Sequence, residues 1–141
     1  DYPDAYYHSF FGGAFQINDP LTEWSDDRRE QLKTHLRVYK GIRHLLDKTL
    51  ALPLGDSLSL ESWLAWQFYD EREGVVIAFR NRSAKQTRIL PMHGIDERAR
   101  YLIEDPYTGM TREQSGRSLA REGLPLLLGP GGSQVVKYKQ L

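Results

Sequence analysis

The sequence has no cysteine among its 141 residues. This excludes a disulfide framework, thiolate chemistry and a zinc site built on cysteines. It also has no apolar run near the roughly 18 residues that a membrane-spanning helix needs, and no signal-peptide pattern. From these absences we expect no membrane partner, and the cytoplasm is slightly favoured as the location. The first residue is Asp1 rather than Met, so a missing N-terminal part stays open.

An excess of charge of one sign is missing too. Lys plus Arg number 19 and Asp plus Glu number 19, which gives a formal net charge of zero. Nucleic acids and anionic membranes bind clustered positive charge, so this balance argues against a nucleic-acid partner. A chain of this length is typical of one domain that can bury a real core.

Residues 26–47 have the pattern of one long amphipathic helix. Ser25 is a good N-cap, and Asp26 and Asp27 place negative charge on the first turn. Apolar residues then recur three or four positions apart, as on one helix face: Leu32, Leu36, Tyr39, Ile42 and Leu46. Gly41 costs roughly 1 kcal/mol relative to Ala in a helix interior, which suggests a closely packed neighbour at that turn.

After Pro53 the apolar residues alternate with period two. The segment WLAWQFYDEREGVVIAFRN (63–81) places two apolar runs around the charged turn 70–74, which predicts a β-hairpin. Further strands are predicted at 88–91, 100–104, 124–128 and 134–139, separated by Gly- and Pro-containing turns. The pattern predicts a mainly β protein, an antiparallel β-sandwich of Greek-key or jelly-roll type preceded by one long helix. We expect an irregular segment plus helix over 1–50 and the β-domain over 51–141.

The two tryptophans of this hairpin invite different interpretations. Trp66 shares one strand face with Leu64 and Phe68, and we expect that face to be core. Trp63 lies on the opposite, mixed face. Trp63 and Trp24 are therefore the candidates for stacking on a sugar, although tryptophan is also common at packing surfaces between domains.

No catalytic constellation emerges from the spacing of polar residues. The four histidines lack metal-ligand spacing, and the sequence contains neither HExxH nor GxSxG. His35 and His44 are expected to be surface or packing residues. The stretch GPGGS (129–133) lacks the Lys-Ser/Thr ending of a phosphate loop. No two carboxylates are singled out as an acid/base pair, so we assign no catalytic, cofactor-binding or metal-binding residue.

Several segments resemble the melibiase-type α-galactosidases of glycoside hydrolase family 36. FFGGAFQINDPLTEWSDDRREQLKTHLRVYKGIRHLL (10–46) resembles the closing segment of that family's catalytic (β/α)₈ barrel. The hairpin 63–81 resembles the start of the antiparallel domain that follows. Its later strands are matched by LPMHGIDERARYLIEDPYTG (90–109), SGRSLAREGLPLLL (115–128) and SQVVKYKQL (133–141).

The resemblance implies a role without catalysis in this chain. In that family two aspartates, a nucleophile and an acid/base, sit at barrel strand ends, and no stretch here matches their motifs. A (β/α)₈ barrel takes about 250 residues, so this chain of 141 residues is too short to contain one. The implied partner is an upstream catalytic barrel of the same polypeptide, with support of stability or of homo-oligomer contacts as the role. The alternative is a free-standing carbohydrate-binding β-sandwich.

Overall fold

A computed structural model describes residues 3–13, 15–47, 52–55 and 59–141. The helices are α1 (Asp4–His8), the 3-10 helix η1 (Leu21–Glu23), α2 (Asp26–Leu46) and α3 (Gly116–Arg121). The strands are β1 (Leu52–Pro53), β2 (Trp63–Tyr69), β3 (Glu73–Arg80), β4 (Thr87–Leu90), β5 (Arg100–Glu104), β6 (Thr111–Ser115), β7 (Leu124–Leu127) and β8 (Ser133–Gln140). Within these residues no helix combines the length and apolar character that crossing a membrane requires.

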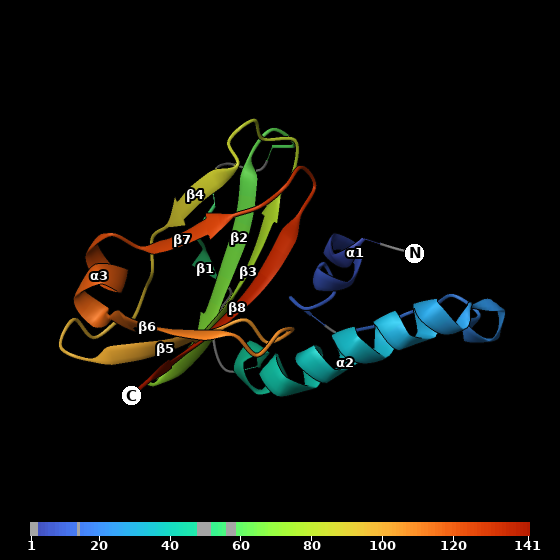
Figure 1. Cartoon of the computed structure of the whole chain (residues 1–141), viewed down its shortest axis with the longest axis horizontal. Coiled ribbons are helices and arrows are strands. Elements are labelled where there is room, and N and C mark those ends of the chain that lie inside the picture. Colours follow the sequence, from blue (N-terminus) through green and yellow to red (C-terminus); the bar gives the residue numbers. More distant parts are fainter. Residues whose placement is uncertain (1–2, 14, 48–51, 56–58) are drawn as a thin grey trace.

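The strands form two antiparallel sheets. The larger has the order β1-β2-β3-β8-β5-β6, and the smaller pairs β4 with β7. The small sheet lies across one face of the large one, and α1 and α2 lie on the other side (Figure 1). The predicted mainly β fold with one long helix is confirmed.

The predicted hairpin 63–81 is also confirmed. β2 pairs with β3 in antiparallel register, with Trp66 opposite Ile77. At the turn, Asp70 Oδ1 accepts hydrogen bonds from the backbone N–H groups of Arg72 and Glu73, each at 3.0 Å. Asp side chains commonly stabilise such turns by accepting hydrogen bonds from the backbone N–H groups of the residues that follow.

The two faces of β2 are buried to different degrees from those expected. The face of Trp63 and Ala65 looks into the sandwich, where both side chains are packed with residues of β4 and β7. Trp63 is only 1 % exposed, and its indole N–H donates to the carbonyl of Lys85 at 2.9 Å. Trp66 is half-buried on the opposite face. The expectation that the Trp66 face is core is confirmed in part: Trp66 packs against a buried cluster that includes Phe68, but it is itself half-buried. Trp63 is the more deeply buried tryptophan. Because β2 is covered on both faces, the alternation alone cannot tell which face is deeper.

Helix α2 begins where its cap predicts. Ser25 Oγ accepts the backbone N–H of Arg28 at 3.3 Å. Its buried stripe consists of Leu32, His35, Val38, Ile42 and Leu45. Gly41 is exposed and a Cβ added there would meet nothing within 4 Å, so the suggested close packing at this turn is wrong. The C-terminal end of α2 lies against the large sheet, while its N-terminal half runs past it beside α1 (Figure 1).

Some short elements differ from expectation. Residues 4–8 and 21–23 are helical turns within a segment predicted to be irregular. Strand β6 and helix α3 lie between the predicted strands 100–104 and 124–128, where only turns were expected. Ser115 caps α3, because its hydroxyl accepts the backbone N–H of Ser118 at 3.2 Å.

Candidate functional site: an apolar groove and a buried histidine network

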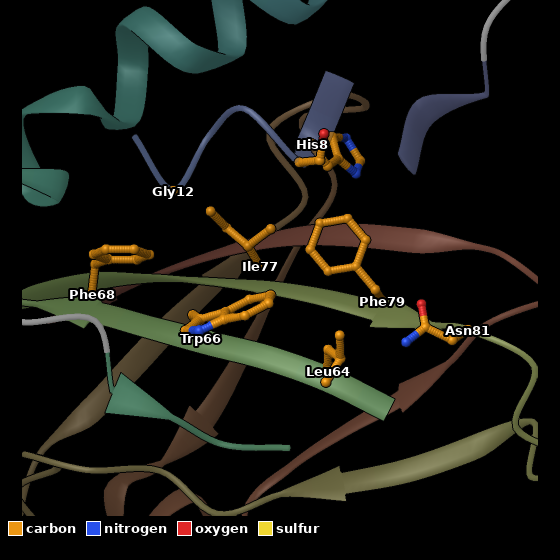
Figure 2. Close-up of a pocket in the computed structure, with 9 residues that line it drawn as sticks. His8, Gly12, Leu64, Trp66, Phe68, Ile77, Phe79 and Asn81 are labelled. Atoms are coloured by element: carbon orange, nitrogen blue, oxygen red, sulfur yellow. The ribbon is translucent and has the colours of Figure 1, made fainter. Parts of the chain in front are cut away.

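An apolar groove of about 390 Å³ lies between the β2–β3 hairpin and the chain that follows α1. Its floor consists of Leu64, Trp66, Phe68, Ile77 and Phe79, and polar side chains and backbone at its rim come from His8, Ser9, Gly12 and Asn81. Figure 2 shows the floor side chains rising from one face of the two strands toward residues 8–12. We call this the hairpin groove.

The hairpin groove is covered unevenly. Phe68 and Ile77 are buried under α2, whereas Trp66 and Phe79 are only half-buried. The rings of Trp66 and Phe79 meet edge to face, with centroids 6.0 Å apart. A contiguous apolar patch that stays partly open to solvent is typical of an interaction surface.

Beside the groove, five polar residues from four segments join in a chain of contacts, which we call the histidine network. Ser133 Oγ lies 2.6 Å from His8 Nδ1, and His8 Nε2 lies 2.8 Å from Tyr107 Oη. Tyr107 Oη also lies 2.6 Å from His35 Nδ1. At the far end, His35 Nε2 is 3.4 Å from a carboxylate oxygen of Asp4. The network thus connects α1, α2, the β5–β6 turn and β8.

Burial controls the protonation of the histidine network. Desolvation, with the nearby His35 as a second cause, lowers the pKa of His8 to about 4, against the opposing effect of Asp4 and Asp105. Desolvation also lowers the pKa of His35, again opposed by Asp4. For Tyr107, burial raises the pKa of the phenol. At neutral pH both imidazoles are therefore neutral and the phenol keeps its proton.

Sequence reasoning could not find this network. His8 and Ser133 are separated by 125 positions, and His8 and Tyr107 by 99, so no local spacing relates them. His35 was expected to be a surface or packing residue, and it is 2 % exposed with the ring of Tyr7 stacked on it at 4.1 Å. The one weak signal in the sequence for a buried histidine was the position of His35 on the apolar stripe of α2.

The two tryptophans proposed as sugar contacts lie apart from each other. Trp24 is buried beside Tyr7 and Leu32, with the guanidinium of Arg28 3.5 Å from the centre of its ring. Trp63 is enclosed in the sandwich. Contact of either ring with a sugar stays a prediction. In the part of the chain that the structure describes, no group of three His, Cys, Asp or Glu side chains could hold a metal ion.

No protein-family model matches the chain, and no curated protein sequence does either. Solved structures do. The GH36 α-galactosidase AgaB from Geobacillus stearothermophilus superposes with a TM-score of 0.78 at 23% identity, over 96% of this chain and 19% of AgaB. AgaA from the same organism superposes with a TM-score of 0.77 at 21% identity, over 96% of this chain and 19% of AgaA.

A third similar structure is the galactosidase domain of the α-galactosidase–sucrose kinase AgaSK. It gives a TM-score of 0.70 at 22% identity, over 86% of this chain and 17% of that one. This chain thus spans less than a fifth of each of these three structures, while most of its own length is matched. Its fold is that of one portion of the GH36 α-galactosidases.

Proposed function

We propose that this chain is the C-terminal, non-catalytic β-domain of a GH36-type α-galactosidase and packs on the catalytic barrel of the same polypeptide. The observation that supports this most is the asymmetry of coverage, 96% of this chain against 19% of AgaB. The remaining four-fifths of such an enzyme has room for a barrel of about 250 residues. By resemblance, residues 1–50 are the end of that barrel and 51–141 the β-domain.

The hairpin groove supports the same proposal. Its half-buried aromatic floor suits an apolar protein surface, because buried apolar area stabilises at roughly 25 cal/mol per Å². We assign the upstream part of the same polypeptide as its occupant, since the similar enzymes are about five times as long as this chain. Docking in the hairpin groove would hold α2, by resemblance the last helix of the barrel, in place. It would also support stability or contacts between subunits.

The test is hydrolysis of p-nitrophenyl α-galactoside by the 141-residue chain and by the longer gene product that contains it. We expect activity in the longer protein alone. Activity in the short chain would contradict the non-catalytic role. Inactivity of both would remove the α-galactosidase assignment, and a gene without an upstream barrel would remove the domain assignment as well.

Carbohydrate binding by the chain itself is the second candidate function. The observation that favours it is Trp66, a half-buried indole in a groove whose rim includes Asn81 and His8. Raffinose is a suitable probe, because a variant of AgaA has been solved in complex with it. Binding would change the fluorescence of Trp66 and would be lost in Trp66→Leu. An unchanged spectrum in millimolar raffinose would rule against this function.

A further inference from the structure

The geometry of the histidine network determines the direction of its hydrogen bonds. The carboxylate of Asp4 can only accept, so His35 Nε2, 3.4 Å away, holds the ring proton. In neutral His35 the other nitrogen, Nδ1, is then bare and accepts the hydroxyl proton of Tyr107 at 2.6 Å.

The same reasoning continues to the other end. Tyr107 has one proton, already donated, so its oxygen accepts the N–H of His8 Nε2 at 2.8 Å. His8 Nδ1 is then bare and accepts the hydroxyl of Ser133 at 2.6 Å. Every bond points from Ser133 toward Asp4, and both imidazoles are neutral Nε2–H tautomers.

We propose that the histidine network is an acid-sensitive latch, which holds α1 and α2 on the sandwich in neutral solution and releases them when its imidazoles gain protons. The reason lies at Tyr107. If His35 alone gains a proton, neutral His8 can change tautomer and accept the phenol proton at Nε2. When both rings are protonated, His35 Nδ1 and His8 Nε2 both point a proton at the phenol oxygen. The phenol then has no acceptor within the network, and a buried hydroxyl without an acceptor is destabilising.

The charged groups around the network have opposing effects on the protonation of its histidines. Two imidazolium rings with centroids 5.6 Å apart would repel each other. The carboxylates of Asp4 and Asp105 favour protonation of His8. Asp4 is largely exposed, so solvent weakens its effect, and burial of the rings prevails.

The pH window follows from the shifts. An unfolded histidine has a pKa near 6.5, and the pKa of folded His8 is about 4. Between these values the unfolded chain binds protons that the folded chain does not. The contribution of the neutral imidazoles to stability is therefore complete above pH 6.5 and is lost as the pH falls toward 4. None of this depends on the proposed enzymatic context.

The first test is the tautomer of each ring, read from ¹⁵N NMR of histidine-labelled 141-residue chain at pH 7.5. We expect a bare Nδ1 and a protonated Nε2 in both His8 and His35. A protonated Nδ1 in either ring would overturn the direction of the chain of bonds, and with it the latch.

The second test is hydrogen exchange of residues 3–13 and of β2–β3 at pH 7.5 and 4.5, corrected for intrinsic rates. We expect the protection of residues 3–13 to fall at least tenfold more than that of β2–β3. Tyr107→Phe, which keeps the ring and removes the hydroxyl, should show the low protection at both pH values. Equal protection of 3–13 at both pH values in the parent would overturn the proposal.

The matched control is His44→Gln. His44 is also on α2, but it is exposed and paired with Glu73 at 2.8 Å, outside the network. This variant should respond to pH as the parent does. If His44→Gln abolishes the pH response, or Tyr107→Phe leaves it unchanged, the response arises elsewhere and the latch is wrong.

Discussion

Trp63 and Trp66 occupy the same strand but contribute to stability in different ways. Trp63 is enclosed and hydrogen-bonded within the sandwich, so Trp63→Ala should lower the free energy of unfolding by about 3–5 kcal/mol. Trp66 is half-buried, and Trp66→Ala should cost about 1–2 kcal/mol on the area scale. Urea denaturation followed by circular dichroism measures both. Equal costs would contradict the assignment of the two faces.

Gln67 is a buried polar clamp between β2, β8 and the residues after β4. Its Oε1 accepts the backbone N–H of His93, and its Nε2 donates to the carbonyl of His93 and to Tyr138 Oη, at 2.9, 2.9 and 2.5 Å. Gln67→Leu should lower the free energy of unfolding by about 3 kcal/mol, because these buried groups lose their partner. The exposed Gln16→Leu is the control and should change it by less than about 0.5 kcal/mol. A Gln67→Leu chain as stable as this control would show that water replaces the amide.

The period-two pattern of residues 63–69 identified the strand but not its deeper face. One face of β2 packs against β4 and β7, and the other meets α2 and residues 8–12. Both faces are therefore apolar, and only the partner sheet decides which is enclosed. The pattern predicts that Gln67 is a surface residue, yet it is fully buried. It can be buried because distant segments of the chain supply its hydrogen-bond partners.

At the scale of elements, Gly41 in α2 is a position where the helix is less stable than it could be. It lies in the helix interior with open space around it. Gly41→Ala should raise the free energy of unfolding of the 141-residue chain by up to about 1 kcal/mol. Thermal melts measure this.

Gly116 provides the contrast, because a Cβ there would meet the backbone of Asp96 and Ala99. Gly116→Ala should therefore destabilise the same chain. A stabilising effect at Gly116, or a loss at Gly41, would show that the packing around α3 or α2 differs from that described.

Elements with strong local signals were predictable, and weakly marked ones were not. α2 has a cap, charged first turn and apolar stripe, and the strands of the hairpin have alternating apolar residues. β6 reads Thr-Arg-Glu-Gln-Ser, with no apolar residue, because it is an edge strand paired on one side only. α3 is six residues long and begins at the Gly of the pair Ser115-Gly116, which is equally typical of a turn.

At the scale of the whole molecule, the hairpin groove predicts how this chain meets the rest of its proposed polypeptide. Leu64→Glu places a charge on the groove floor, where Leu64 is only partly buried. It should change the melting temperature of the 141-residue chain little, but should lower that of the longer gene product by several degrees, because a desolvated carboxylate is costly.

Ile89→Glu is the matched control. Ile89 is exposed on β4, away from the groove, and should affect neither protein. Equal melting temperatures of the longer protein and its Leu64→Glu variant would place the contact on another surface.

The three tryptophans also form a ready set of optical reporters. Each belongs to a different apolar cluster: Trp24 packs with Tyr7, Trp63 with the sandwich interior, and Trp66 with the cluster under α2. Three single-tryptophan variants would therefore give separate emission signals from the start of α2, the sandwich and the hairpin groove. Fluorescence measurements on these three variants could follow the order in which the three regions assemble during refolding.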